Sequence, residues 1–266
     1  MIDWFQAVVL ALVQGLTEFL PISSSAHLVL PPLLLDWPDQ GLAFDVAVHV
    51  GTLSAVLLYY RFDLARMATA WAGSLAGRGS SEDSRLVWYL GLATVPAGLV
   101  GLFAGDFIEG NLRTLPVIAA TTLLFGILLG VADRGAQAQT AARALTLPIA
   151  LLIGCAQAFA PVPGVSRSGV TITAGLLLGM RRQDAARFSF LLSIPVILMA
   201  GSYKTLQLAQ QTGPVDWGSI LLGTLVAAVS AYLCIHFFLR LIERIGMLPF
   251  VVYRLLLGAC LLVLFY

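Results

Sequence analysis

The polar residues best suited to chemistry begin inside an apolar stretch near the N-terminus. Glu18 follows an apolar run, and Gln14 lies four residues earlier, so the two side chains share one helix face. An ionisable group at membrane depth is costly and marks a functional site by default. Its carboxylate is a hard oxygen ligand of the kind that divalent cations prefer. The alternative is an interfacial glutamate at a helix end.

A proline then separates Glu18 from three serines and a histidine. If a helix restarts near Ser23, then Ser24 and His27 lie three residues apart and share a face. A hydroxyl beside an imidazole is the minimum for an activated nucleophile. Serine is also an ordinary helix cap, which accounts for at least one of the three hydroxyls at Ser23, Ser24 and Ser25.

A second polar cluster surrounds Arg167. Glycines allow close backbone approach, successive N–H groups can form an anion-binding nest, and the following helix adds its positive end. The arginine fork matches phosphate oxygens, and neighbouring hydroxyls add donors. The residues predicted to bind an anion are Gly164, Ser166, Arg167, Ser168, Gly169 and Thr171, together with Gln14, Ser23 and Ser25 of the first cluster. The alternative for Arg167 is a structural ion pair with Glu18, because buried charges usually pair.

The rest of the chain must hold these clusters inside a membrane. Of its 266 residues 59% are hydrophobic and 11% are charged, whereas soluble domains usually carry about 25% charged residues. The net charge of +1 gives no electrostatic case for nucleic acid. No polar linker divides the chain, so we expect one integral membrane domain over residues 1–266.

Six segments are apolar and long enough to span a bilayer, which needs roughly 20 residues. They are Phe44 to Tyr60, Leu86 to Gly105, Leu115 to Ala132, Arg187 to Tyr203, Ser219 to Leu239 and Pro249 to Tyr266. The sequence therefore predicts an all-α polytopic membrane protein.

Two further apolar regions are interrupted by proline. Trp4 to Leu35 breaks at Pro21 to Ser25, and Leu147 to Met180 breaks at Pro161 to Gly169. Proline disrupts a helix, and such backbone survives at membrane depth only when it is buried in protein or faces water. We predict two re-entrant helical hairpins.

Charge sets the expected orientation, because cytoplasmic loops collect Lys and Arg. Placing Arg61 to Arg85 inside puts most other arginines inside, provided that each hairpin enters and leaves on one side. Both termini and the mouth of the first hairpin then lie on the periplasmic side. The hairpins enter from opposite sides, so the halves, about 1–133 and 146–266, form an inverted-topology repeat. Phe19-Leu20-Pro21 echoes Phe159-Ala160-Pro161 in the same order.

Two long motifs carry a resemblance to a known family. Residues 14–28, QGLTEFLPISSSAHL, and residues 163–171, PGVSRSGVT, resemble the two signatures of the bacterial undecaprenyl-diphosphate phosphatase family, which is linked to bacitracin resistance. Phe44 to Arg61 and Phe188 to Gly201 also resemble that family, so the likeness covers nearly the whole chain. One position departs from the pattern, because residue 14 is often Glu in the family and is Gln14 here.

The resemblance implies a bacterial inner-membrane enzyme that hydrolyses the terminal phosphate of a C55 polyprenyl diphosphate. The product is the monophosphate carrier lipid used in peptidoglycan synthesis. It also implies a divalent metal, Mg²⁺ or Ca²⁺, for which Glu18 and Gln14 are the expected ligands. We expect Arg167 to hold phosphoryl oxygens and Ser24 to attack with His27 as general base. A metal-bound water is the alternative nucleophile.

The same sequence admits other functions. Inverted repeats with broken helices also occur in transporters, so a lipid-phosphate flippase is the alternative function. A phosphatase of the acid-phosphatase type is set aside, since Lys204 is the only lysine and lacks that motif. We interpret His49 and His236 as core histidines without polar neighbours. Glycines four residues apart, at Gly101 and Gly105 and at Gly126 and Gly130, are typical of a homodimer interface or, alternatively, of close packing between helices of one chain.

Overall fold

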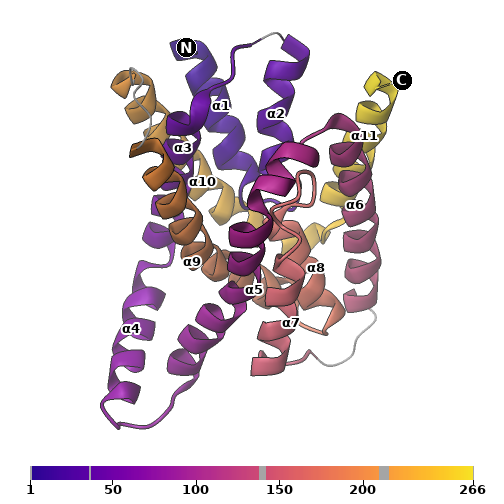
Figure 1. Ribbon diagram of the computed structural model, residues 1–266. Coiled ribbons are helices and arrows are strands. Elements are labelled where there is room, and N and C mark those ends of the chain that lie inside the picture. Colours follow the sequence, from indigo (N-terminus) through magenta and orange to yellow (C-terminus); the bar gives the residue numbers. More distant parts are fainter. Residues whose placement is uncertain (1, 36, 138–141, 210–215, 266) are drawn as a thin grey trace.

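The chain folds into a bundle of helices with two breaks near its middle (Figure 1). The computed structural model describes residues 2–35, 37–137, 142–209 and 216–265. Within these ranges it contains helices and no strands. The helices are α1 Trp4–Thr17, α2 Ser24–Leu35, α3 Gly41–Tyr59, α4 Arg61–Leu75, α5 Glu82–Asn111, α6 Leu115–Gln137, α7 Leu147–Gln157, α8 Arg167–Leu177, α9 Arg182–Ala209, α10 Trp217–Ile245 and α11 Leu248–Phe265.

Five helices are long and apolar enough to cross a membrane, namely α3, α5, α6, α9 and α10. They correspond to five of the six predicted spans and run longer than expected at several ends. The sixth predicted span corresponds to α11, which is apolar but falls among the shorter helices. The sequence-based prediction of an all-helical, multi-pass membrane protein is confirmed at this level.

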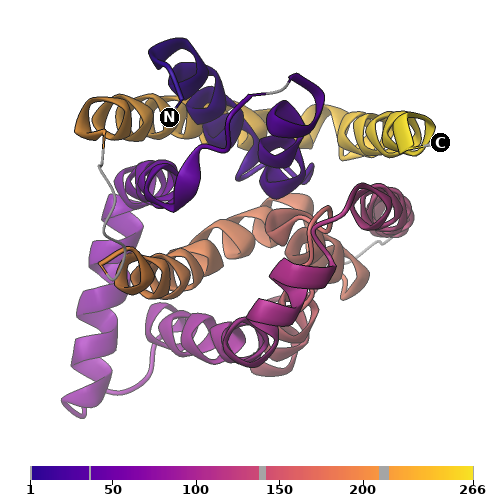
Figure 2. The same cartoon turned by 45° about the horizontal axis from the view of Figure 1, so that its top comes forward.

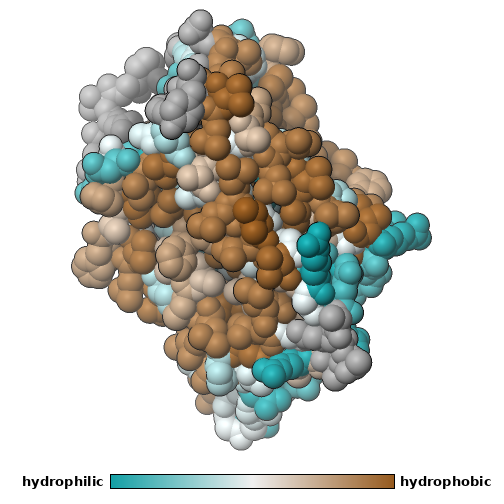
Figure 3. All heavy atoms as spheres, turned by 90° about the vertical axis from the view of Figure 1, so that its right-hand side faces the viewer, coloured by the Kyte–Doolittle hydropathy of each residue, from teal (hydrophilic) through white to brown (hydrophobic). Residues whose placement is uncertain are grey.

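The outer surface matches that assignment. Large apolar side chains are exposed on several helices, including Leu102, Phe103, Leu225 and Val263. Figure 3 shows one side of the molecule covered mainly by hydrophobic residues, with hydrophilic residues confined mainly to its margins. Contiguous apolar surface of this extent is not tolerated in water, and lipid is the solvent that accommodates it.

Both interrupted regions are helix pairs with the break where proline predicts it. In the first pair α1 ends at Thr17 and α2 begins at Ser24, and in the second α7 ends at Gln157 and α8 begins at Arg167. Figure 1 shows α1 and α2 at the same end as both termini, and α7 and α8 at the opposite end. The two breaks therefore approach each other near the middle of the bundle.

Each helix pair packs against the other half of the chain through a glycine. A Cβ on Gly15 of α1 would lie 2.7 Å from the Ala227 carbonyl oxygen of α10. A Cβ on Gly154 of α7 would lie 2.5 Å from the Ala93 carbonyl oxygen of α5. Figure 2 shows α1 beside α10 on one side of the molecule and α5 beside α7 on the other. Close backbone crossings fix where the two breaks lie.

One sequence expectation is corrected here. Residues 61–85, expected as a loop, contain α4 and the start of α5, which project from the bundle away from both termini (Figure 1). Arg66 pairs with Asp63 at 3.0 Å and with Asp83 at 2.6 Å, which joins the two projecting helices.

The glycine pairs considered for a homodimer differ in their surroundings. Gly126 and Gly130 face Arg254 and Val251 of α11 and are used for packing within the chain. Their small size lets α6 approach α11 closely, so they are not free for a second copy. A Cβ added to Gly101 or Gly105 would meet no other atom within 4 Å, and dimerisation through these two glycines stays a prediction.

Candidate functional site

The two breaks share an unusual backbone feature. Among the described residues, Ser23 with φ 74° and Ser166 with φ 73° are the only non-glycine residues at positive φ. Such a conformation costs of order 1–3 kcal/mol and persists where the surrounding structure enforces it. Each serine immediately precedes a helix, so Ser24 and Arg167 are the first residues of α2 and α8. The two strained serines thus place the Ser24 hydroxyl and the Arg167 guanidinium at corresponding positions, each at the start of the helix that follows a break.

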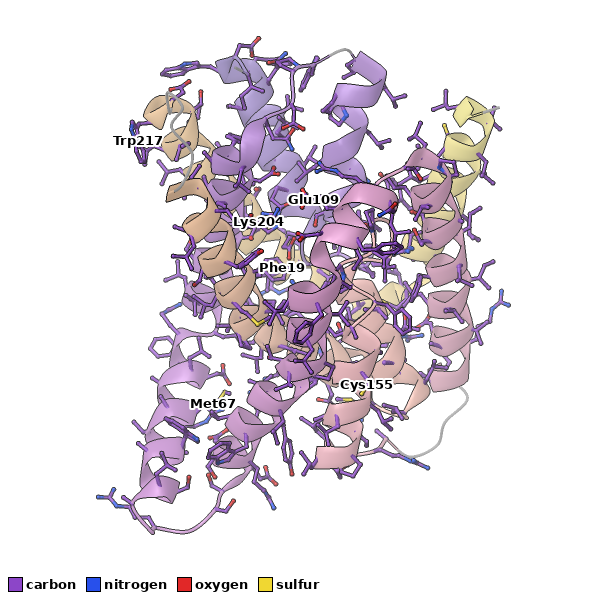
Figure 4. All side chains as sticks on the ribbon, viewed as in Figure 1. Phe19, Met67, Glu109, Cys155, Lys204 and Trp217 are labelled. Carbon is purple, nitrogen blue, oxygen red and sulfur yellow. The ribbon has the colours of Figure 1, made fainter. Side chains whose placement is uncertain are left out.

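Glu18 receives both of these groups. Its side chain is 8% exposed. Oε2 accepts hydrogen bonds from Ser24 Oγ at 2.9 Å and from Gln14 Nε2 at 3.0 Å, and Oε1 accepts one from Arg167 at 2.9 Å. The neighbouring Phe19 is labelled near the middle of the molecule in Figure 4. The prediction that Gln14 and Glu18 share a face is confirmed.

Arg167 is braced on two sides. One terminal nitrogen donates to Glu18, and the other donates to the Ser189 carbonyl of α9 at 3.1 Å. The guanidinium also lies 5.7 Å from the centre of the Phe19 ring. The ion pair with Glu18, expected as the structural alternative, is formed, and it links the two breaks directly. A charge held this way is oriented before any ligand arrives.

The expected Ser24–His27 pair is not formed. His27 Nδ1 lies 2.7 Å from the Ser23 carbonyl oxygen, so Nδ1 carries the proton and donates it. His27 Nε2 lies 2.6 Å from the Tyr253 hydroxyl, and the two rings stack. Both ring nitrogens are therefore engaged away from Ser24, whose hydroxyl donates to Glu18. The prediction of a shared helix face is correct, but the ring turns toward α11.

Most of the other predicted anion donors have protein partners. Ser168 donates to the Leu20 carbonyl oxygen at 2.8 Å, which ties α8 to the first break. Ser166 caps α8 by accepting from the Gly169 N–H at 3.0 Å. Thr171 contacts Ser189 Oγ at 2.7 Å. These contacts hold the second break in shape, and binding of an anion by the same hydroxyls stays a prediction.

The Ser23 and Ser25 hydroxyls lie in the first break next to Ser24, with 3.2 Å between their oxygens. Gly164 and Gly169 lie close to neighbouring atoms that a side chain would displace. Gly164 has φ 89°, and a Cβ there would lie 2.6 Å from the Ile118 carbonyl oxygen of α6. A Cβ on Gly169 would lie 3.0 Å from Ser166. Ser166 caps the Gly169 N–H, whereas the N–H groups of Arg167 and Ser168 at the start of α8 have no intrahelical acceptor and leave the positive helix end available to an anion.

Three residues of the site were missed or misread from the sequence. His49, interpreted as a core histidine without polar neighbours, lies with Nε2 3.9 Å from Glu18 Oε2 and is 37% exposed. Tyr253 and Arg254 of α11 approach the breaks from the far end of the chain. Arg254 is the one charged residue within the α11 range, and that signal could have found it. By contrast His236 packs against the Tyr59 ring.

The donor set fits a divalent cation held by few protein ligands. A carboxylate offers about four lone-pair positions, and three of those on Glu18 are taken, with one left on Oε1. Gln14 Oε1 is buried without a partner. The described residues contain no cluster of three His, Cys, Asp or Glu side chains. These two oxygens suit an ion that takes its other ligands from a bound anion and water, as Mg²⁺ usually does.

Comparison with known proteins gives one consistent picture. Residues 7–260 match the family described as bacitracin resistance protein BacA. The undecaprenyl-diphosphatase of Teredinibacter turnerae is 60% identical over 98% of this chain and 99% of its own length. The undecaprenyl-diphosphatases of Saccharophagus degradans and Thioalkalivibrio sulfidiphilus are 60% and 57% identical, with coverage of at least 96% of each chain.

Proposed function

Since the chain belongs to the bacitracin resistance protein BacA family, we propose that it is an undecaprenyl-diphosphatase of the bacterial inner membrane. It hydrolyses undecaprenyl diphosphate to the monophosphate and inorganic phosphate. The observation that carries this function is the meeting of Ser24, Glu18 and Arg167 at two strained breaks inside an apolar bundle. The flippase alternative is not favoured, because the relatives are named as enzymes.

Arg167 and the start of α8 bind the diphosphate in this proposal. Phosphoryl transfer needs positioning and charge stabilisation more than covalent machinery. The guanidinium fork meets two phosphoryl oxygens, and its bond to the Ser189 carbonyl keeps it oriented. The first-turn N–H groups of α8 and the hydroxyls of Ser23 and Ser25 complete the anion site.

Ser24 is the proposed nucleophile, and Glu18 replaces His27 as the acceptor of its proton. Ser24 Oγ bonds to the terminal phosphorus while the bridging P–O bond breaks, and undecaprenyl monophosphate leaves with that bonding pair. The hydroxyl proton passes to Glu18 Oε2, 2.9 Å away. A water oxygen then bonds to phosphorus while the P–Oγ bond breaks, Ser24 takes back the proton held by Glu18, and the water protons leave with inorganic phosphate. His27, fixed by Ser23 and Tyr253, positions the start of α2.

A divalent metal is part of the proposal, with Glu18 and Gln14 as its protein ligands. When bound, Mg²⁺ or Ca²⁺ would neutralise charge on the phosphoryl oxygens. Gln14 supplies a neutral amide oxygen in place of a carboxylate. The chain thus contributes one negative ligand, and the affinity for the free ion is weak until the substrate adds its own oxygens.

We expect Ser24→Ala to abolish turnover. The covalent route needs a hydroxyl that is bonded to Glu18 and can attack the phosphorus, and Ser24 supplies that hydroxyl. A phosphoserine should be trapped by rapid quenching of wild-type protein with labelled substrate and should map to residues 23–25. If water attacks directly, Ser24→Ala loses one hydrogen-bond donor and about 10²–10³ in rate. Measurable turnover by this variant, with no label on the wild-type peptide, excludes the covalent route. Ser74→Ala is the matched control, because the Ser74 hydroxyl bonds to the Trp71 carbonyl within α4 and lies outside the site.

The proposed architecture refines the helical bundle. We infer that α11 is a sixth span, that α1–α2 and α7–α8 are re-entrant hairpins, and that halves 1–133 and 146–266 form an inverted repeat in one domain. The inverted repeat is supported by two equivalent glycine contacts, one in which α1 of the first half packs on α10 of the second and one in which α7 of the second half packs on α5 of the first. The two strained serines at matching places support it as well. The lipid-facing surface accommodates the isoprenoid tail.

The orientation makes a separate prediction. Both termini and the open end of α1–α2 face the periplasm, while the turn between α4 and α5 faces the cytoplasm. In cells of a background without native cysteines, a membrane-impermeant maleimide should not label Ser80→Cys until the membrane is permeabilised. An introduced cysteine at Asp39 should label at once. Labelling of Ser80→Cys in intact cells reverses the assignment.

The function itself is tested by incubating purified protein with undecaprenyl diphosphate and measuring inorganic phosphate. We expect release that stops with a divalent chelator and resumes when Mg²⁺ or Ca²⁺ is restored. Absence of release under every metal condition, from protein that is folded, contradicts the proposed function.

A further inference from the structure

Arg254 lies fully buried in α11 beside both breaks, and its exposed fraction is 0%. Its nearest partners are backbone carbonyl oxygens. Nε donates to Thr122 at 3.2 Å, one terminal nitrogen donates to Pro21 at 3.2 Å and Val165 at 3.1 Å, and the other donates to Gly164 at 2.7 Å and Thr121 at 3.4 Å. A guanidinium has five N–H donors, and each has an acceptor here.

A buried cation of this kind usually has a carboxylate partner. Among the residues the structure describes, no Asp or Glu oxygen lies within 4.0 Å of the Arg254 nitrogens. The charge is instead surrounded by carbonyl dipoles from three different segments. Ion pairing therefore does not account for the position of Arg254, and the geometry of its five donors does.

The acceptors come from both breaks and from α6. Pro21 belongs to the first break, and Gly164 and Val165 belong to the second. A single terminal nitrogen joins Pro21 to Val165, so one planar group spans the gap between the hairpins. The Val165 carbonyl belongs to the peptide plane that precedes Ser166, and holding this plane restrains the positive φ of Ser166. Arg167 is the next residue.

We infer that Arg254 is a positioning residue that fixes the two breaks relative to each other, so that Glu18 and Ser24 meet Arg167. The inference rests on the proposed function and assigns a role to a residue that does not contact the substrate. Two other links cross the same gap, Ser168 to Leu20 and Arg167 to Glu18. Arg254 binds more backbone positions than either, and it comes from a third element.

Arg254→Lys separates geometry from charge. Lysine keeps the positive charge but has three donors on one atom, so it cannot bridge Pro21, Val165 and Thr122 together. We expect kcat to fall about 10²-fold, since a displacement of about 1 Å in a catalytic constellation has that effect. We expect KM to stay within about twofold, because the groups that bind the diphosphate are retained.

Arg182→Lys is the matched control. Arg182 is a partly buried arginine, paired with Asp133 at 2.6 Å near the α10–α11 turn and outside the site. Its replacement by lysine should lower thermal stability without changing kcat. A role of Arg254 in stability alone predicts that the two variants lose stability in parallel and keep wild-type kcat.

A readout that needs no turnover is hydrogen–deuterium exchange in proteoliposomes, compared between wild-type protein and both lysine variants. Arg254→Lys should speed exchange in peptides covering residues 18–27 and 160–171 and leave α3 and α10 unchanged. Unchanged exchange at both breaks, or wild-type kcat in folded Arg254→Lys, overturns the inference. Lack of turnover by wild-type protein instead contradicts the proposed function, while the exchange result still tests the link between the breaks.

Discussion

Arg167→Lys loses about 10³-fold or more in kcat/KM, which is the range seen when a transition-state arginine is removed from phosphoryl transfer. The native guanidinium donates through separate nitrogens to Glu18 and to the Ser189 carbonyl and keeps further N–H groups for a phosphate. A lysine ammonium is a point charge that cannot make these contacts in one plane. Arg167→Ala should be at least as severe.

Phosphate release by purified variants in detergent measures this effect, with thermal unfolding as a check on folding. Arg187→Lys is the control, because Arg187 pairs with Asp63 at 2.8 Å and is 42% exposed. Exposed ion pairs contribute about 0–1 kcal/mol, so this control should keep wild-type turnover. Wild-type turnover by Arg167→Lys contradicts a fork-type contact with phosphate.

Glu18→Gln is expected to reduce turnover below about 10⁻³ of the wild-type rate, because it removes the proton acceptor of Ser24 and the charged metal ligand together. The substitution keeps the shape of the side chain. The amide can still bond to Ser24, but it no longer takes a proton or offsets the Arg167 charge. Added Mg²⁺ or Ca²⁺ should then neither restore activity nor raise the melting temperature.

Stability needs a separate control for this variant. Breaking one side of a buried ion pair typically costs about 3–5 kcal/mol, so Glu18→Gln should unfold at lower temperature than wild-type protein. The double variant Glu18→Gln, Arg167→Gln removes both charges and should regain stability without regaining turnover. Glu109→Gln, at a 69% exposed position, is the matched surface control. A wild-type metal response in Glu18→Gln places the metal ligand elsewhere.

Much of the site was predictable because it depends on short-range sequence. Helical spacing places Gln14 on Glu18, and the prolines place the breaks. The direction of the His27 ring was not predictable, since it is set by Tyr253, which is 226 residues away in sequence. The proximity of His49 to Glu18 likewise depends on how α3 packs against the first break.

Long helices were predicted better than the roles of single side chains. The length of the apolar segments identified five spans. In lipid the backbone N–H and C=O groups must bond to each other, so a long apolar segment forms a helix. The hydroxyls of Ser166, Ser168 and Thr171 were predicted as ligands from their residue type. Whether a hydroxyl binds a ligand or a neighbouring carbonyl depends on tertiary contacts, and here all three have protein partners.

The central claim is that this chain removes the terminal phosphate of undecaprenyl diphosphate at the meeting point of the two breaks. The most direct measurement uses substrate labelled only in its terminal phosphate, with purified wild-type protein and with Arg167→Ala reconstituted in vesicles. We predict that wild-type protein releases all of the label as inorganic phosphate, one per unlabelled monophosphate lipid formed, and that Arg167→Ala releases almost none. Label that stays in the lipid, with or without movement of that lipid across the bilayer, contradicts the account.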